Sequence, residues 1–373
     1  MKILHINSYY STSVLFENLY QRQEADYDLD VYVPISHQYP SERLPEVKDY
    51  TTIHRTFNHL DRWVFHYKHK KILDDLLQTY DVNQYDLIHA HSLFSNGWLA
   101  YKLHQQFGTP YIVAVRNTDV KVFFKRMFWL RPMGLSILRN ASKIIFISKS
   151  AYNEVFDNYI PEREIPFLKN KTSIIPNGIH PFWHEHLNTQ KEAKLHEPLR
   201  IVTTAKLLRT KRLINLAERV ESYNENIFPA ELHVIGPEWD QTIVEQLKQF
   251  PNVTLYGSRN QMEMMQLYRQ MDVFALLSYP ETFGLVYVEA MSQGLPLIYT
   301  TGEGFDSYFP DKFLGVSVDP SNGLAFSDAL DYIVYNYKEM MTNALHSVPQ
   351  FDWDKIYNTY QDLYKDIFGE ETT

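Results

Sequence analysis

Two glutamates stand eight positions apart in the segment Tyr279 to Pro296, which reads YPETFGLVYVEAMSQGLP. If the chain is helical from Thr282 onward, the carboxylates of Glu281 and Glu289 lie about 12 Å apart along the helix axis and less than about a quarter turn apart around it. One extended ligand could therefore contact both carboxylates. The same spacing also fits a core helix that carries two capping or solvated acids.

A helix start at this place offers such a ligand a second feature. The first backbone N–H groups of a helix have no partner within it and attract anions, and Gly284 would let a phosphate approach the backbone closely. A nucleotide sugar has the matching shape, with a ribose at one end, a hexose at the other and a diphosphate between them. The rest of the chain has to decide between this interpretation and the core helix.

The composition is that of a globular protein. The chain has 373 residues, 45% of them hydrophobic and 22% charged, which is typical of two domains. It contains no cysteine, and this excludes disulfides, thiolate metal sites and a cysteine nucleophile. We find neither an export signal nor an apolar run long enough to span a membrane, and we expect a cytoplasmic protein.

Charge is distributed unevenly along the chain. The net charge is −9, but residues 1–180 hold 21 Lys and Arg against 18 Asp and Glu, whereas the remainder holds 15 against 27. Two basic aromatic stretches, Arg62 to Lys71 and Val120 to Asn153, lie in the first part. They favour either a peripheral contact with an anionic membrane, at its inner face, or a basic wall of an anionic substrate cleft. Because no nucleic-acid-binding motif accompanies them, we expect no nucleic acid partner.

Short apolar runs alternate with stretches of helical periodicity along the chain, a pattern that predicts parallel sheets with crossover helices. The alternation stops between Ile179 and Pro198 and then restarts. We therefore expect an α/β protein of two Rossmann-like, doubly wound domains that face each other across a cleft, residues 1–180 and 181–353, with an amphipathic C-terminal helix over 354–373 packing back on the first domain. The predicted strands are Lys2–Ile6, Leu29–Val33, Leu87–Ala90, Tyr111–Val115, Lys143–Ile147, Ser173–Ile175, Arg200–Thr204, Glu231–Ile235, Asn252–Tyr256, Val273–Leu277, Leu297–Tyr299 and Gly315–Val318.

Three motifs carry a resemblance to a known family: DLIHAH at Asp86–His91, PNGI at Pro176–Ile179, and the pair Glu281 and Glu289 followed by GLP. Together with the two predicted domains they resemble the retaining glycosyltransferases of family 4, which have the GT-B fold. The resemblance covers nearly the whole chain. It implies transfer of a hexosyl group from a nucleoside diphosphate sugar, of the UDP or GDP type, to a hydroxyl of a glycan or lipid-linked acceptor, without a cofactor or a catalytic metal.

The resemblance also assigns roles on the donor side. The family opens its second domain with G-R-L-x-x-x-K-G, and this chain has AKLLRTKR at Ala205 to Arg212. Lys206 and Lys211 would stabilise the charge that grows on the leaving diphosphate. The other implied donor residues are Glu281 for the sugar, Glu289 for the ribose, the backbone of Phe283, Gly284 and Leu285 for the phosphates, and Gly257, Arg259 and Gly236 for the nucleobase side, although a surface turn explains Gly257 and Arg259 equally well.

The first domain departs from the family in two places. Where the family has a glycine pair that approaches the donor phosphates after its first strand, this chain has a loop rich in hydroxyl side chains, and polar contacts would replace that close backbone approach. Ser11 and Thr12 of this loop are acceptor-side candidates. Where the family has a histidine, this chain has Arg116. Arginine cannot act as a general base, so Arg116 either holds a phosphate or an anionic acceptor, or it forms a structural ion pair with Asp119.

Two further residues, His91 at the end of its predicted strand and Asp119, are acceptor-side candidates. We expect no metal ion at Asp28-Leu29-Asp30, which introduces a strand at a sheet edge, or at the histidines of residues 180–186, which lie in the domain junction. Two alternatives to a transferase stay open. One is a non-catalytic GT-B protein that binds glycan or partners a transferase, and the other is a GT-B sugar-nucleotide enzyme of another reaction type.

Overall fold

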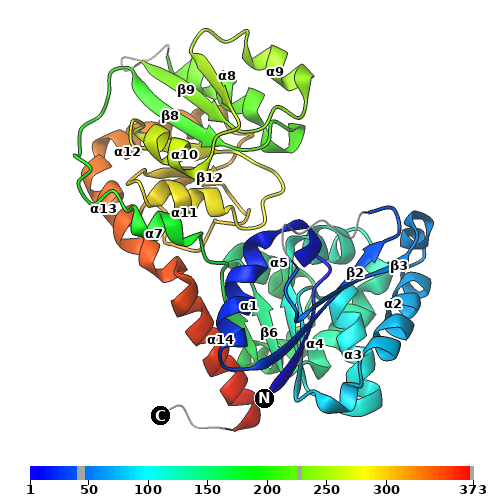
Figure 1. The fold of residues 1–373 in the computed structure, drawn as a ribbon. Helices are drawn as coiled ribbons and strands as arrows, with labels where there is room; N and C mark the ends of the chain where they lie inside the picture. The colour runs from blue at the N-terminus through cyan, green and yellow to red at the C-terminus, as the bar shows by residue number, and fades with distance from the viewer. Residues whose placement is uncertain (40–46, 225–228, 370–373) are drawn as a thin grey trace. The chain divides into compact units, whose positions relative to one another are not determined.

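The computed structural model describes residues 1–39, 47–224 and 229–369, without the side chains of Thr12 and Val14. The chain forms two compact units, each built on one parallel sheet (Figure 1). Unit 1 comprises Met1–Ile147, Ala151–Pro176 and Trp353–Thr373, and unit 2 comprises Ser148–Ser150 and Asn177–Asp352.

The sheet of unit 1 has seven strands in the order β3-β2-β1-β4-β5-β6-β7. The order reverses beside β1, as in doubly wound folds that bind ligands at the carboxyl ends of their strands. The register places His5 of β1 opposite His89 of β4. The strands are β1 Lys2–Ile6, β2 Asp28–Ser36, β3 Thr51–Phe57, β4 Leu87–Ala90, β5 Tyr111–Val115, β6 Lys143–Phe146 and β7 Thr172–Ile174.

Different helices cover the two faces of this sheet, because successive side chains of a strand point to opposite sides. Leu4 and Ile6 of β1 belong to the core that α2, α3 and α4 cover, whereas Ile3 packs in the core with α1 and α14. Figure 1 shows α1 and α14 side by side on their face. The α-helices before Pro176 are α1 Glu17–Glu24, α2 Phe65–Thr79, α3 Ser95–Phe107, α4 Arg131–Asn140, α5 Lys149–Asn158 and α6 Ile165–Asn170.

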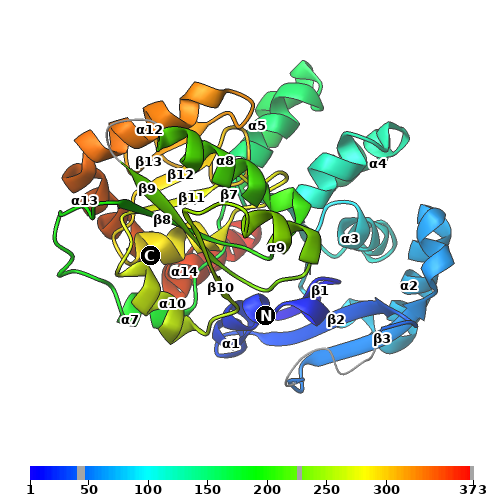
Figure 2. The same ribbon diagram turned by 90° about the horizontal axis from the view of Figure 1, so that it is seen from above.

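The sheet of unit 2 has six strands in the order β10-β9-β8-β11-β12-β13, and β8, β9 and β10 are seen beside one another in Figure 2. Its strands are β8 Leu199–Thr204, β9 Ala230–Ile235, β10 Val253–Gly257, β11 Val273–Leu276, β12 Leu297–Thr300 and β13 Gly315–Val318. Its helices are α7 Pro181–Glu185, α8 Leu213–Tyr223, α9 Gln241–Leu247, α10 Gln261–Tyr268, α11 Leu285–Met291, α12 Gly323–Tyr335 and α13 Tyr337–Ser347.

The predicted α/β architecture with two Rossmann-like sheets is confirmed, with one strand missed. The missed strand, β3, pairs only with β2 at the edge of the sheet of unit 1. Most side chains of β3 are only partly buried, so its sequence TTIHRTF can be polar at most positions and lacks the apolar run that marks a buried strand. Within the described residues, no helix is both long and apolar enough to cross a membrane.

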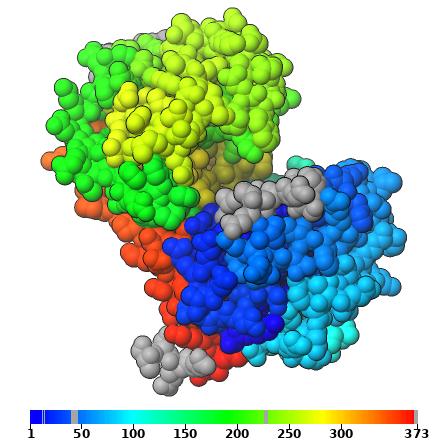
Figure 3. Space-filling view, in the orientation of Figure 1, coloured from blue at the N-terminus to red at the C-terminus, as the bar shows by residue number. Residues whose placement is uncertain are grey.

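The C-terminal helix α14, Trp353–Phe368, packs in unit 1. It begins one residue before the predicted bound and directly follows a short 3-10 helix, Val348–Phe351, whose buried residues belong to the core of unit 2. One side of α14 is exposed and forms the orange-red surface in Figure 3. Its buried side carries six residues that belong to the core of the α1 face: Trp353, Ile356, Tyr357, Tyr360, Leu363 and Tyr364.

Tyr364→Phe tests how α14 is held. The Tyr364 hydroxyl is buried, accepts a hydrogen bond from Nε2 of Gln23 at 2.7 Å and lies 2.8 Å from Nδ1 of His89. Removing it leaves two buried polar groups without a partner, which costs about 1–3 kcal/mol each. We expect a melting temperature several degrees below that of the parent, at roughly 2–4 °C for each kcal/mol. The control is Tyr335→Phe, on a side chain that is 89% exposed; equal melting temperatures for the two variants would contradict the expectation.

Candidate active site

The predicted donor residues follow the carboxyl ends of four neighbouring strands of unit 2. Lys206 lies just after β8, Gly236 just after β9, Gly257 at the end of β10 and Glu281 after β11. Parallel strands end at the same edge of their sheet, so these residues from distant parts of the sequence share one edge. The loops after four strands of unit 2 therefore form one edge of its sheet, where the predicted donor residues lie.

An ion pair lies at the centre of this edge. Nζ of Lys211 is 2.7 Å from Oε2 of Glu281, and the side chains of both residues are largely buried. The Ser278 hydroxyl donates to the same carboxylate oxygen at 2.7 Å, and the backbone N–H of Thr282 donates to the other oxygen at 3.0 Å. The tertiary structure thus brings together two residues that are 70 positions apart.

The prediction that the chain is helical from Thr282 is wrong. Helix α11 begins at Leu285, so Glu281 lies in the loop before it and only Glu289 lies on the helix. The N-cap residue, Gly284, has a φ of 81°, and a Cβ atom there would lie 2.5 Å from the Tyr287 ring. Only glycine avoids this clash in the left-handed conformation. The turn that it makes separates the Glu281 loop from the helix.

The residues beside Gly284 expose little more than backbone. The Phe283 side chain is buried, and its ring centroid lies 5.8 Å from that of Phe305 and 5.5 Å from that of Tyr308. Leu285 is partly buried against the same core. This arrangement suits the predicted role of the segment, in which backbone rather than side chains contacts phosphates, and that role stays a prediction.

Glu303, in the loop after β12, holds the Glu281 loop in place. It is 4% exposed, and its Oε2 accepts the backbone N–H of Glu281 at 2.8 Å. In return the N–H of Gly304 donates to the Glu281 carbonyl at 3.2 Å. A Cβ atom on Gly304 would lie 2.7 Å from the nitrogen of Phe283. The sequence placed an acid between two glycines here, but only the tertiary structure identifies what it binds.

Glu289 lies on α11 in an environment that disfavours its charge. Burial raises the pKa of its carboxyl group to about 7, and the neighbouring Trp183 indole opposes this shift only in part. An acid with a raised pKa and no cationic partner destabilises the fold when it ionises, and such groups are typical of functional sites. Glu289 is therefore suited to binding hydroxyl groups, as donor or acceptor.

Of the remaining donor-side residues, Lys206 and Arg259 are exposed at the same edge, whereas Gly236 is buried. Nζ of Lys206 lies 4.1 Å above the ring of Trp239, a side chain 61% exposed that the sequence analysis did not single out. Arg259 is exposed and donates to the Ser258 carbonyl. Gly236 has a reason to be glycine, because a Cβ atom there would lie 1.9 Å from the Ala205 carbonyl oxygen.

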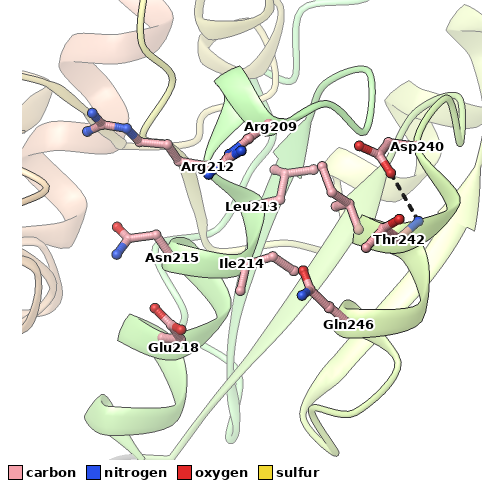
Figure 4. Close-up of a pocket in the computed structure, with 10 residues that line it drawn as sticks. Arg209, Arg212, Leu213, Ile214, Asn215, Glu218, Asp240, Thr242 and Gln246 are labelled. Atoms are coloured by element: carbon pink, nitrogen blue, oxygen red, sulfur yellow. Dashed lines mark hydrogen bonds between the residues drawn. The ribbon is translucent and has the colours of Figure 1, made fainter.

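A hollow of about 640 Å³ lies near this edge in unit 2, between α8, α9 and the loop before α8 (Figure 4). Arg209 and Arg212 line it together with the acids Glu218 and Asp240. Asp240 is the N-cap residue of α9, and its carboxylate accepts a hydrogen bond from the backbone N–H of Thr242. None of the predicted donor residues lines the hollow, and we assign no ligand to it.

The acceptor-side residues lie in unit 1, after β4 and β5. Nε of Arg116 donates to the His91 carbonyl at 3.0 Å, and no hydrogen bond in the described part of the chain engages its two Nη atoms. The Asp119 carboxylate accepts backbone N–H groups of Leu93, Phe94 and Arg116 at 2.8–3.0 Å. Asp119 thus joins the loops after β4 and β5 through their backbones, and the Arg116 side chain is turned to the His91 carbonyl.

Burial raises the pKa of Asp119 to about 6, and the three backbone hydrogen bonds oppose that shift. Since Asp119 is 1% exposed, its carboxylate is directed into the protein. Ser11 is also buried, in a short 3-10 helix, Tyr10–Thr12, and the side chain of Thr12 lies outside the described part of the chain. Arg116 is itself only 8% exposed, and its Nη atoms have no hydrogen-bond partner among the described residues.

His91 belongs to a buried group of three histidines on the α1 and α14 side of the sheet. Nδ1 of His5 lies 3.0 Å from Nε2 of His91, and the rings of His89 and His91 stack at 4.3 Å. Burial lowers the pKa of His5 to about 3 and those of His89 and His91 well below their usual range. All three are therefore neutral at pH 7, and the His91 ring does not reach the surface.

The three imidazoles have the one metal-like arrangement found among the described residues, with ligand atoms within 4.8 Å of one another. Neutral imidazole is the form that binds metals. However, the positive charge of Arg116 contributes to lowering the pKa of both His89 and His91, and the same charge opposes a bound cation. The histidines in residues 180–186 are engaged instead with backbone groups of Phe182 and Phe351.

Two family models match the chain one after the other. The model described as Glycosyltransferase Family 4 matches residues 13–181, and the model described as Glycosyl transferases group 1 matches residues 185–344. The boundary between the matches falls near the junction between the two sheets.

Curated relatives are similar along most of the chain. A D-inositol 3-phosphate glycosyltransferase of Stackebrandtia nassauensis is 22% identical over 309 residues, which cover 76% of this chain and 68% of that protein. An alpha-monoglucosyldiacylglycerol synthase of Acholeplasma laidlawii is 21% identical over 252 residues, 62% of each protein.

Solved structures share the fold. Sucrose-phosphate synthase from Thermosynechococcus elongatus is 19% identical with a TM-score of 0.73, and all of both chains is covered. Anabaena HepE, in a complex with UDP and glucose, is 16% identical with a TM-score of 0.67 and covers 98% of this chain and 100% of its own. These likenesses show that the two sheets form the GT-B fold.

Glu289→Gln tests the raised pKa of Glu289. The folded pKa, about 7, lies above the ordinary value of 4.5, so folding favours the protonated acid and stability falls as pH rises through this window. The amide cannot ionise. We expect the variant to melt several degrees higher than the parent at pH 8 and close to it at pH 5. Glu218→Gln, at an exposed site on α8, should show no such pH-dependent difference, and a Glu289→Gln variant that behaves like it would refute the shift.

A pair of substitutions at Glu303 tests the support of the Glu281 loop. Glu303→Ala leaves the buried N–H of Glu281 without an acceptor, which costs about 1–3 kcal/mol. Glu303→Gln keeps an acceptor oxygen at the same place. Thermal unfolding should therefore show a clear loss of stability for alanine and recovery of most of it by glutamine. If both variants melt like the parent, the loop does not depend on Glu303.

Proposed function

Since the chain is a GT4-like glycosyltransferase with the GT-B fold, we propose that it is a retaining, metal-independent enzyme of the cytoplasm. In this proposal it transfers a hexosyl group from a nucleoside diphosphate sugar to a hydroxyl of a glycan or lipid-linked acceptor. The observation that carries the proposal is the buried pair of Lys211 and Glu281 at the carboxyl edge of the sheet of unit 2. A largely buried ion pair is weak evidence for stability, and its place at the strand-end edge, in a loop that Glu303 holds through the Glu281 backbone, suits a ligand-binding role.

The donor would bind along this edge. Glu289 would accept hydrogen bonds from the ribose hydroxyls, the Glu281 loop would contact the hexose, and backbone groups at residues 283–285 would meet the diphosphate. Lys211 and Lys206 supply positive charge from the loop after β8. The Lys206 ammonium makes a cation–π contact with the ring of Trp239, and this contact would help to keep the Lys206 side chain at the edge.

We propose a UDP sugar rather than a GDP sugar, because the HepE structure contains UDP and glucose. In the reaction the bond between the anomeric carbon and the diphosphate oxygen breaks, and its electron pair passes to the diphosphate. The acceptor oxygen forms a bond to the same carbon on the same face, and its proton passes to a diphosphate oxygen. The protein then needs no nucleophile, and preorganised cations stabilise the growing charge of the leaving group.

On the acceptor side, Arg116 stands where the family has a histidine, and we propose that it binds an anionic acceptor. Its guanidinium is fixed by the His91 carbonyl and by the ring of Phe16, 5.3 Å away, and it still has Nη donors to offer. A planar guanidinium suits a phosphate or carboxylate. One of the two curated relatives supports this class, since its name specifies a phosphorylated inositol, whereas the glucosyldiacylglycerol named by the other carries no charge.

The test is a thermal-shift screen of nucleotides and nucleotide sugars, followed by a transfer assay with the sugar that stabilises the protein most. A specific donor stabilises the folded state by mass action, by about 2.7 kcal/mol at one hundred times its dissociation constant. Glu281→Gln should reduce transfer by two or more orders of magnitude, as loss of one preorganised polar group does, while nucleotide binding persists. Arg116→Ala should reduce transfer and leave nucleotide binding unchanged.

A matched control is Glu263→Gln, which changes an exposed helix-capping acid of unit 2. It should transfer at the parent rate. Nucleotide binding with no transfer to any glycan or lipid acceptor would favour the non-catalytic alternative, and failure of every nucleotide to stabilise the protein would reject the donor site.

A further inference from the structure

The two basic aromatic stretches of unit 1 expose apolar side chains that no other part of the described chain covers. The first forms a 3-10 helix, His59–Trp63, and the start of α2, and the second forms a π-helix, Asp119–Phe124, and a 3-10 helix, Phe128–Leu130. Trp63 is 83% exposed and Trp129 is 60% exposed. We call the exposed apolar residues of the two segments the aromatic face: Leu60, Trp63, Val64, Tyr67, Val122, Phe128 and Trp129.

The two segments are joined beneath the aromatic face. Phe65, at the first position of α2, lies with its ring 5.8 Å from that of Phe123, and Phe123 stacks on Phe94 at 4.7 Å. Both segments are thus anchored against the α2, α3 and α4 core, while neighbouring side chains are exposed. An ordered backbone therefore presents the exposed rings, so the exposure is a property of the fold.

The same segments are positively charged. Arg62, Lys70, Lys125 and Arg126 are exposed among the apolar residues. The two acids of the segments do not cancel this exposed positive charge. Asp61 forms an ion pair with Lys71 at 2.9 Å and caps the first 3-10 helix, and Asp119 is buried. On a chain whose net charge is −9, this face therefore attracts anions.

Tryptophan and tyrosine beside arginine and lysine match the boundary between lipid headgroups and hydrocarbon. Aliphatic side chains such as Leu60, Val64 and Val122 suit that boundary better than they suit a nucleic acid, which offers phosphates and stacked bases. Exposed apolar patches of this size are unfavourable in water unless they meet a partner. We propose that the aromatic face docks this protein on the surface of an anionic lipid bilayer.

This proposal deepens the acceptor side of the proposed function, because docking would bring unit 1 to lipid-linked acceptors. It does not require turnover. Binding is measured on the full chain without donor or acceptor, so that loss of vesicle binding and loss of sugar transfer are independent results.

The experiment is flotation with vesicles of phosphatidylcholine, with and without phosphatidylglycerol, at low and high salt. We expect binding to the vesicles that contain phosphatidylglycerol and release at high salt, which screens exposed charges. Arg126→Glu should lower the bound-to-free ratio roughly tenfold, since each basic residue near an anionic surface contributes several-fold to binding. Trp63→Ser should weaken binding and leave its salt dependence unchanged.

Two control variants carry the same chemical changes elsewhere. Lys355→Glu reverses an exposed charge on α14, and Tyr335→Ser removes an exposed aromatic ring on α12. Both should bind vesicles like the parent, and circular dichroism checks that all four variants fold. No binding to anionic vesicles at low salt would overturn the proposal, as would equal losses in the face and control variants. Binding of single-stranded RNA in place of vesicles, abolished by the same face variants, would assign the face to nucleic acid instead.

Discussion

The parallel direction of every strand in the two sheets is the constraint on which the rest of the structure depends. Parallel strands need crossover helices, and these helices cover both faces of each sheet, so the strand interiors must be apolar. Polar groups are then placed chiefly at the strand ends. All the carboxyl ends of a sheet lie at one edge, and this edge collects Lys211, Glu281, Glu289 and Glu303 in unit 2 and Arg116 in unit 1.

Three acids that are wholly or partly buried show three ways of placing a carboxyl group at such an edge. Glu281 has a cationic partner in Lys211. Asp119 has no side-chain partner but receives three backbone N–H groups, and a carboxylate with several such donors tolerates burial. Glu289 has neither, and its pKa rises to about 7. The first two acids stabilise loops, whereas the third lies beside the Trp183 indole without a cationic partner and is suited to a ligand with hydroxyl groups.

Unit 1 uses neutral polar groups where unit 2 uses charges. His5, His89 and His91 lie on one face of neighbouring strands because their positions differ by two or are in register. Tyr364 brings the C-terminal helix to the same network through His89, and the His91 carbonyl holds Arg116. The rings of His89 and His91 stack on each other, so hydrogen bonds and ring stacking together connect α14 to Arg116, the residue that departs most from the family. One ring nitrogen of each histidine, Nε2 of His5, Nε2 of His89 and Nδ1 of His91, is buried without a hydrogen-bond partner among the described residues, so this group is only partly satisfied.

The sequence by itself determined the sheets, because apolar runs and turn residues act locally. It placed β1, β4, β5 and β13 at their observed bounds and missed β3, whose edge position leaves its side chains polar. It also selected Lys211 and Glu281, through the spacing of a family motif. Only the tertiary structure decided where α11 begins, because the sequence pattern alone does not show that Gly284 takes the left-handed conformation. It also decided that the Glu303 carboxylate accepts the backbone N–H of Glu281. It also decided that the Arg116 side chain donates to the His91 carbonyl, while only the Arg116 backbone N–H donates to the Asp119 carboxylate. These outcomes depend on contacts between loops far apart in sequence, and no local pattern encodes which carbonyl or N–H group a folded loop will present.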